Sequence, residues 1–352
     1  MDLSMSWLKD YVDIDVDIKD FVEDITLTGS KVEGWSEIGG ELSGIVTGKV
    51  LKIEKHPNAD RLVICTVDIG KDEPLIIVTH APNVFEGAYV CVALDGATLA
   101  GGIEIHDTDF RGVMSYGMMC SVEEMGFDRH DFPEAPENGI YIFENEVPLG
   151  KDVCKVMDLK DKVVEFEITS NRPDCFSTVG LAREVAATYN KEFKYPEIAV
   201  KEEADGDIES MIQVEIKNPE LCPRYTARVV KNVKVEPSPR WMRKRLRSNG
   251  IRPINNIVDI TNYVMLELGQ PMHAFTIGNI DGSKIVVRNA EDGEKITTLD
   301  GNERQLDSSM LVIADCNKAV AVAGVMGGEN SKVNGSTDTI LFESANFNGP
   351  NV

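Results

Sequence analysis

Residues 253–275, PINNIVDITNYVMLELGQPMHAF, set polar side chains against an apolar pattern more clearly than any other stretch of this chain. The stretch predicts a helix that starts near Asn255 or Asn256 and stops at Gly269, because Asn suits a helix N-cap and Gly a C-cap. Thr261 falls on the apolar stripe of this helix. A polar side chain therefore interrupts a face that should be buried.

The chain after this helix can bring His273 back beside Thr261 and Asn262. A helix rises roughly 10 Å from Asn262 to Gly269, at about 1.5 Å per residue. After the turn signal GQP, four extended residues return about 13 Å at roughly 3.3 Å each. The spacing allows two interpretations: a catalytic group of three residues, or a capped helix with a hydrogen-bonded histidine.

Two strands are predicted in the last fifty residues, 319–328 (AVAVAGVMGG) and 339–345 (TILFESA), and a hairpin or nearby pairing could join them. Alternation places Glu343 on the face opposite to that of Phe342. The pattern alone favours a solvated position for this carboxylate over a place in a site. Ala323 and Gly324 have almost no side chain and leave room for a ligand ring.

The net charge of −23 argues against nucleic-acid binding over the chain as a whole. Residues 224–252, however, hold ten Lys or Arg and one acid. The sequence predicts a helix there, capped by Ser238 and ended by Gly250, with its arginines, Arg243 and Arg247 among them, facing away from Trp241. This surface is either a polyanion site or a solvated face.

Length and composition are typical of a multidomain globular protein, because 352 residues exceed one ordinary core. From Gly44, about five short alternating strands in about a hundred residues suggest a small β-barrel of the OB type. The acidic segment 201–210 is predicted to be a linker. Seven scattered cysteines indicate reduced thiols and a cytoplasmic location, and no apolar run could span a membrane.

Several motifs of catalysis and metal binding are missing from the sequence. It has no glycine-rich phosphate loop with its lysine, no HExxH, no CxxC and no nucleophile elbow. We therefore expect no metal site and no cofactor in this chain, and no activation of ATP by it.

Longer motifs carry a resemblance to a known family. The segments KHPNADRLVICTVDIG, ALDGATLAGG and RGVMSYGMMCSVEEMG resemble the tRNA-binding OB domain of several synthetases. EITSNRPDCFSTVGLAREVAA, RPINNIVDITNYVMLELGQPMHAF and AGVMGGENS resemble the β subunit of bacterial phenylalanyl-tRNA synthetase. The resemblance covers the whole chain. Because the family subunit is much longer, the resemblance implies that this chain is the N-terminal portion of such a subunit.

The resemblance implies a multidomain α+β fold. A split N-terminal α/β domain would comprise residues 1–39 and 151–200, with a tRNA-binding OB-fold domain inserted as 40–150. Residues 210–352 would form a mixed α/β editing domain, truncated at its C-terminus. In the family, this domain hydrolyses tyrosine wrongly attached to tRNA(Phe).

The resemblance also implies roles for individual residues. His273, Thr261 and Asn262 would form the catalytic part of an editing pocket; Ala323 and Gly324 would line it; Glu343 would accept a hydrogen bond from the tyrosine hydroxyl. ATP and Mg²⁺ would serve the holoenzyme, and the partners would be tRNA(Phe) and the catalytic α subunit, two of each subunit together.

The sequence departs from the family in one respect. Acidic residues stand in GGIEIHDTDF, where related OB domains are rich in lysine, so Arg61 and Arg111 remain the candidate tRNA contacts of this domain. Two functions stay open: an editing hydrolase, or a scaffold that contacts tRNA without hydrolysis. A free-standing tRNA chaperone built on the OB barrel is a third option.

Overall fold

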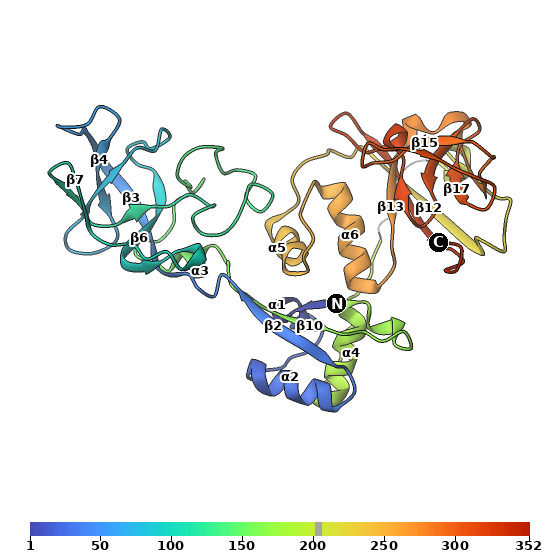
Figure 1. The fold of residues 1–352 in the computed structure, drawn as a ribbon, viewed down its shortest axis with the longest axis horizontal. Helices are drawn as coiled ribbons and strands as arrows, with labels where there is room; N and C mark the ends of the chain where they lie inside the picture. The colour runs from blue at the N-terminus through green and yellow to red at the C-terminus, as the bar shows by residue number, and fades with distance from the viewer. Residues whose placement is uncertain (201–205) are drawn as a thin grey trace. The chain divides into compact units, whose positions relative to one another are not determined.

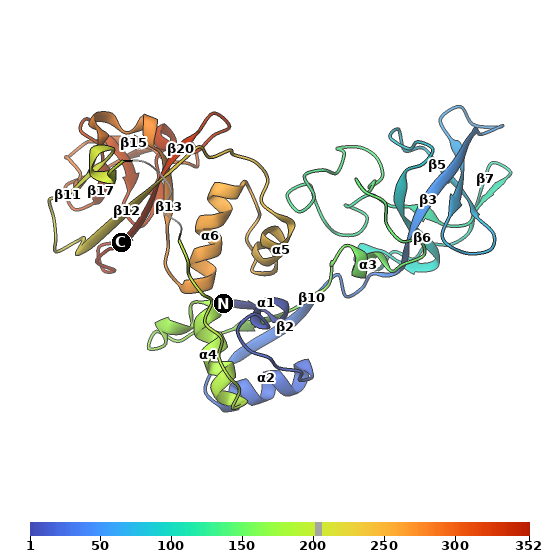
Figure 2. The same cartoon turned by 180° about the vertical axis from the view of Figure 1, so that it is seen from behind.

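The computed structural model describes residues 1–200 and 206–352, so half of the predicted linker lies outside the described residues. The chain has an α+β fold, as expected, and its contacts divide it into two units (Figures 1 and 2). The first unit comprises Met1–Lys9, Asp15–Glu167 and Arg247–Arg252. The second comprises Asp10–Ile14, Ile168–Leu246 and Pro253–Val352. No helix in the described ranges combines the length and apolar character that a membrane crossing requires.

The first unit contains a three-stranded antiparallel sheet in which the start of the chain pairs with a strand far along it. Its order is β1-β10-β2, and the segment between β2 and β10 is inserted in this sheet. The helices of this unit carry buried apolar side chains, Trp7 and Leu8 on α1 and Phe21 on α2. The elements are β1 (Asp2–Ser4), α1 (Met5–Leu8), α2 (Ile18–Leu27), β2 (Val32–Ile38), α3 (Val153–Val156) and β10 (Asp161–Phe166).

The inserted segment forms a five-stranded antiparallel sheet of order β5-β4-β3-β6-β9 and a two-stranded ribbon. Both faces of this five-stranded sheet are covered by apolar side chains. Along strand β6, Val90 and Val92 enter one core, whereas Cys91 and Ala93 enter another. The elements are β3 (Ser43–Lys55), β4 (Val63–Asp68), β5 (Leu75–Thr79), β6 (Tyr89–Thr98), η1 (Ala100–Gly102), β7 (Thr108–Phe110), β8 (Val113–Ser115) and β9 (Met118–Met119).

The second unit contains a five-stranded sheet of order β11-β14-β17-β18-β19 and a three-stranded sheet of order β12-β20-β13. Apolar side chains of both sheets share one core, to which Phe275 and Leu341 contribute from the smaller sheet. The strands are β11 (Gln213–Ile216), β12 (Arg224–Lys231), β13 (His273–Thr276), β14 (Lys284–Asn289), β15 (Lys295–Thr297), β16 (Glu303–Gln305), β17 (Leu311–Ala314), β18 (Ala319–Val322), β19 (Met326–Gly327) and β20 (Thr339–Asn346).

The helices of this region include one whose limits were predicted from the sequence. They are η2 (Pro173–Cys175), α4 (Thr178–Thr188), η3 (Ile208–Ser210), α5 (Arg240–Ser248), α6 (Asn256–Leu268), η4 (Ile277–Asn279), η5 (Asp281–Ser283) and η6 (Glu329–Ser331). Helix α6 has the predicted limits, with Asn255 as N-cap and Gly269 in the left-handed conformation at its end. Ser238 is buried just before α5 and donates its hydroxyl to the buried carboxylate of Asp259.

The order of the strands also differs from expectation. Strands β18 and β20 lie in different sheets, so the hairpin predicted between them is wrong. Helix α4 falls in the second unit and contacts α6 there. Gly269, which has a φ of +77°, lies at the end of α6 close to the start of α4, where a Cβ would come 3.3 Å from the Phe176 carbonyl oxygen.

Candidate functional site

His273 and Glu343 lie side by side on the three-stranded sheet. In the antiparallel pairing of β13 with β20, His273 is directly opposite Glu343, and such residues project from the same face of a sheet. Phe275 and Leu341 are the next pair on that face and belong to the core between the two sheets. The predicted alternation of β20 is therefore confirmed, and it directs the Glu343 carboxylate toward the sheet-to-sheet core.

Glu343 is buried, so the solvated position that its pattern favours is wrong. Its exposed fraction is 6%. Burial raises the pKa of Glu343 to about 7, because a desolvated carboxylate is disfavoured, and a hydrogen bond from Tyr225 opposes this rise. Tyr225 Oη donates to Oε2 at 3.2 Å. The other oxygen, Oε1, has no hydrogen-bond partner in the described part of the chain.

His273 is neutral at pH 7, and one of its ring nitrogens has no hydrogen-bond partner among the described residues. Burial lowers the pKa of His273 to about 4. Its Nε2 is inaccessible to solvent and has no hydrogen-bond partner among the described residues. The ring lies against Gly327, where a Cβ would come within 2.5 Å of both Nε2 and Cε1. Buried polar atoms are seldom left unpaired, so this nitrogen marks a place for a ligand atom or a water.

Thr261 and Asn262 lie on a helix that packs against the other face of the same sheet. Ile257 of α6 clusters with Ala274 and Ile340, whose side chains alternate with those of His273 and Glu343. The chain does return along α6, as predicted, but alternation turns His273 away from it. Thr261 is buried and donates to the Val258 carbonyl at 2.7 Å. In the described ranges, neither Thr261 nor Asn262 hydrogen-bonds to His273 or Glu343.

Ala323 and Gly324 differ in their surroundings. Ala323 is buried in the same core as Tyr225 and Phe275. Gly324 has a φ of +72°, and a Cβ at this position would lie 2.9 Å from Val352 Cγ2 and 3.3 Å from Phe347. The space beside Gly324 is therefore filled by the C-terminal segment of the chain in this structure.

Two residues of this site, Tyr225 and Gly327, are absent from the sequence-based candidates. Tyr225 meets Glu343 only through a strand pairing that spans 118 residues, and no local pattern reveals such a register. Gly327 had a weak signal in the MGG of strand β19, since paired glycines permit close approach.

The basic helix α5 is not the exposed face that the charge pattern suggests. Arg243 has an exposed fraction of only 8%. Arg247 lies over the ring of Phe127, 4.5 Å from its centroid, and pairs with Asp131 at 3.6 Å. We therefore correct the assignment of Arg243 and Arg247 as tRNA contacts, because both guanidinium groups are committed to the interior of the protein.

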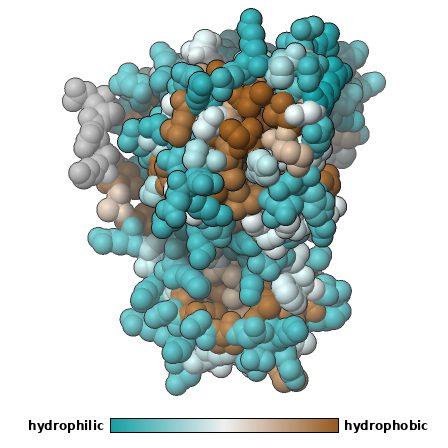
Figure 3. All heavy atoms as spheres, turned by 90° about the vertical axis from the view of Figure 1, so that its left-hand side faces the viewer, coloured by the Kyte–Doolittle hydropathy of each residue, from teal (hydrophilic) through white to brown (hydrophobic). Residues whose placement is uncertain are grey.

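Arg61 and Arg111 are exposed on two loops that are tied together. His56 Nε2 lies 2.7 Å from the Phe110 carbonyl, and Asn58 Nδ2 donates to the Arg111 carbonyl at 2.8 Å. The side of the molecule that Figure 3 presents carries apolar side chains between hydrophilic ones. Exposed apolar side chains of the segment inserted between β2 and β10 include Leu51, Phe85, Ile103, Phe110, Met114 and Tyr116.

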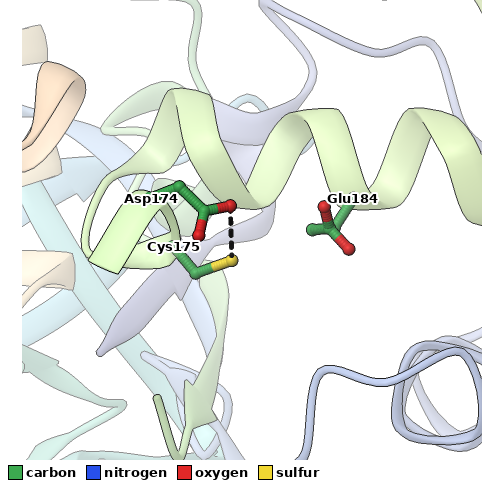
Figure 4. A group of neighbouring side chains, drawn as sticks. All are labelled: Asp174, Cys175 and Glu184. Carbon is green, nitrogen blue, oxygen red and sulfur yellow. Dashed lines mark hydrogen bonds between the residues drawn. The ribbon is translucent and has the colours of Figure 1, made fainter. Parts of the chain in front are cut away.

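One group in the described ranges has the composition of a metal site, but its residues do not suit Mg²⁺. Asp174, Cys175 and Glu184 lie close together near the start of α4 (Figure 4). The Arg172 guanidinium pairs with both carboxylates at 2.8 Å and holds the pKa of Asp174 at about 2. The charge that a cation would need is already neutralised, and a thiol is a poor ligand for this hard ion.

Two family models match separate parts of the chain. The tRNA-binding domain family matches residues 45–152, which include the five-stranded antiparallel sheet of the first unit. The B3/4 domain family matches residues 221–352, which include β12, β13 and β20. His273 and Glu343 thus lie in the B3/4 match, and Arg61 and Arg111 in the tRNA-binding match.

Curated relatives match the whole chain at high identity. The phenylalanine–tRNA ligase β subunit of Clostridium acetobutylicum is 52% identical over 352 residues, and that of Clostridium tetani is 49% identical over the same length. The match covers 100% of this chain and 44% of each relative, so the chain spans less than half their length.

Among solved structures, an N-terminal fragment of the phenylalanyl-tRNA synthetase β subunit from Pyrococcus horikoshii is similar to this chain. It has a TM-score of 0.32 and 15% identity over 55% of this chain and 58% of the fragment. A similarity this low carries no structural argument.

Proposed function

Because this chain belongs to the family of the bacterial phenylalanine–tRNA ligase β subunit, as its N-terminal portion, we propose that its His273–Glu343 site edits mischarged tRNA. The substrate would be tyrosyl-tRNA(Phe), and the reaction would be hydrolysis of the aminoacyl ester. The observation that carries this proposal is a pair of buried side chains with unmet hydrogen-bonding capacity. His273 Nε2 is shut off from solvent without a partner, and among the described residues only Oε2 of Glu343 has a hydrogen-bond partner.

Glu343 supplies the selectivity in this proposal. Tyrosine differs from phenylalanine by one hydroxyl, which can donate to Oε1. A hydrogen bond to a charged group is stronger than a neutral one. With phenylalanine, the carboxyl would stay buried without that partner, at a cost of about 1–3 kcal/mol. A site of this kind rejects the smaller analogue by leaving a polar group unpaired.

His273 positions the reacting groups and does not act as a strong base. Its pKa of about 4 keeps the ring neutral at pH 7, and a group with so low a pKa is far from the optimum for a general base there. A neutral Nε2 can still hold a water or the ester by one hydrogen bond. Since the aminoacyl ester is already activated, positioning can supply much of the rate. Thr261 and Asn262 would then support the sheet from its other face.

The second part of the proposal concerns tRNA binding and the domains that provide it. Residues 40–150 would form an OB-type barrel, residues 1–39 and 151–200 the split domain around it, and residues 210–352 the editing domain. Arg61 and Arg111, exposed on tied loops, would contact phosphates. Acidic neighbours such as Glu104 and Asp109 would keep this binding weak.

In the assembled enzyme, the chain would act with the catalytic α subunit as two α and two β subunits in the cytoplasm. ATP and Mg²⁺ would serve aminoacylation outside this chain. The Arg172-neutralised acidic group is the described cluster with the composition of a cation site, so we derive no step through a metal here.

Deacylation by the full 352-residue chain tests the editing proposal. Tyrosyl-tRNA(Phe) and phenylalanyl-tRNA(Phe) would be incubated with wild type, Glu343→Ala and Glu303→Ala, a control that removes an exposed strand carboxylate. Wild type and the control should release tyrosine preferentially. Glu343→Ala should reduce that preference roughly 5–150-fold, the equivalent of the 1–3 kcal/mol above.

The scaffold function makes the opposite prediction. If residues around His273 and Glu343 only hold the fold, no variant changes deacylation and Glu343→Ala changes stability alone. Absence of tyrosine release by folded wild type would contradict the editing proposal for this chain.

A further inference from the structure

Tyr225 hydrogen-bonds to the Glu343 carboxyl group from the neighbouring strand. Tyr225 stands opposite Ala345 on strand β12, so it is diagonal to Glu343 on the same face of the sheet. Its hydroxyl reaches Oε2 at 3.2 Å. The phenol is itself 8% exposed and buried in the core that the two sheets share. The bond therefore lies within a packed interior and not at a mobile surface.

The hydrogen bond runs from Tyr225 to the ionised carboxylate of Glu343. Burial and the neighbouring carboxylate raise the pKa of Tyr225 well above its ordinary value, so the phenol stays protonated near neutral pH and donates to Glu343 whenever that carboxyl is ionised. Oε2 is therefore engaged, and Oε1 is left as the acceptor for a second hydroxyl. The two oxygens of one carboxyl thus have separate partners, one from the protein and one from the ligand.

We propose that Tyr225 is a positioning residue of the site, which holds Glu343 Oε2 and so keeps Oε1 ionised and directed toward the hydroxyl of a bound tyrosyl group. This inference rests on the proposed editing function for its ligand, but the bond between Tyr225 and Glu343 does not. Without the Tyr225 hydroxyl, the buried carboxyl should bind a proton more readily and lose its selectivity for a hydroxyl donor at neutral pH.

Few other ionisable groups face Glu343. His273 projects beside it from β13, and the Cys222 thiol precedes β12. The remaining neighbours on this face, Ala227, Leu341 and Ala345, are apolar. His273 is neutral over most of the useful pH range, and burial raises the pKa of Cys222. Tyr225 is therefore the dominant polar influence on the Glu343 carboxyl.

The test compares two substitutions that each remove one buried tyrosine hydroxyl. Tyr225→Phe removes the bond to Glu343. Tyr141→Phe is a matched control in the first unit, since Tyr141 also donates to a glutamate, Glu134, at 3.2 Å. Each full-length protein would carry ¹³C-labelled glutamate, and the Glu343 carboxyl resonance, assigned by its loss in Glu343→Gln, would be followed from pH 4 to pH 9.

The expected result is a Glu343 midpoint raised by roughly one pH unit in Tyr225→Phe and unchanged in Tyr141→Phe. The pH at which selectivity for tyrosyl-tRNA(Phe) falls to half should move by the same amount. An unmoved midpoint in folded Tyr225→Phe, or an equal shift in both variants, would overturn the inference.

A second substitution covers the case in which Tyr225→Phe does not fold. 3,5-Difluorotyrosine at position 225 keeps the ring and hydroxyl but is a stronger donor, so it should lower the Glu343 midpoint. No shift or an upward shift would overturn the inference. The titration also separates the two proposals: wild type that fails to release tyrosine contradicts editing, whereas the midpoint still reports on Tyr225.

Discussion

Two polar clusters of the second unit differ in whether their ionisable groups are paired. Around Arg172, both carboxylates are paired with one guanidinium at 2.8 Å, and the group lies near the surface. Around Glu343, a carboxyl and an imidazole are buried with one hydrogen bond between Tyr225 and Glu343, while Nε2 and Oε1 lack partners in the described ranges. The composition of the first cluster resembles a ligand site more closely, but only the second has capacity left for a ligand.

The largest effect should come from filling the space beside His273. In Gly327→Ala, the new methyl group would come within 2.5 Å of Nε2 and Cε1, so the ring must move. A displacement of about 1 Å in a positioned group can cost on the order of 100-fold in rate. We expect deacylation of tyrosyl-tRNA(Phe) to fall by about that factor. Gly335→Ala, where a Cβ meets no neighbour, is the control and should retain wild-type rates.

Stability against pH should reveal the two buried groups separately. The pKa of Glu343 rises from 4.5 to about 7 on folding, so its stabilising contribution is present below pH 4.5 and is lost as pH rises toward 7. The pKa of His273 falls from 6.5 to about 4, so stability is lost as pH falls through that range. Between pH 4.5 and 6.5 the two slopes offset each other.

Replacing one buried group at a time should therefore give opposite slopes of unfolding free energy against pH. In His273→Gln, the unfolding free energy should fall by about 3 kcal/mol as pH rises from 4.5 to 7, because only the Glu343 slope remains. Glu343→Gln should instead gain stability as pH rises from 4 to 6.5. Urea unfolding at half-unit intervals of pH would measure both. Parallel curves for all three proteins would show that neither group changes its pKa on folding.

Among the arginines, exposure should decide which ones affect tRNA. Arg61→Ala should reduce the slope of binding affinity against salt concentration by about one contact, because an exposed guanidinium releases counterions on binding phosphate. Arg247→Ala should leave the salt slope unchanged and lower the stability of the protein, since it removes the pair with Asp131. Filter binding of tRNA at several salt concentrations checks both, and equal slopes for wild type and Arg61→Ala would count against the loop contact.

The smallest effect is expected at the paired cluster. Arg172→Ala should cost at most about 1 kcal/mol of unfolding free energy at neutral pH, as partly exposed ion pairs do. The lowered pKa of Asp174 means that this contribution is present above its ordinary pKa and disappears as pH falls toward 2. Deacylation should not change. A strong loss of tyrosine release in a folded Arg172→Ala protein would remove the distinction between the two clusters.

Local patterns predicted much of the fold, whereas the site depended on long-range pairing. The limits of α6 followed from Asn255 and Gly269, because capping is a property of neighbouring residues. The face of Glu343 followed from alternation, but its burial did not, since that requires a second sheet to cover the strand. Arg243 shows the reverse error: a basic run reads as surface, although tertiary packing buried it.

Binding of stable substrate analogues would show whether the Glu343 site distinguishes a tyrosyl from a phenylalanyl group. Tyrosyl- and phenylalanyl-adenosine linked by a 3′-amide would be titrated into the ¹³C-glutamate-labelled chain, with the Glu343 carboxyl and the His273 ring followed by NMR. We expect both resonances to move with the tyrosyl analogue and the Glu343 shift to be absent with the phenylalanyl analogue. Equal shifts with the two analogues, or none with either, would contradict the claim that the unpaired groups of this site read the hydroxyl.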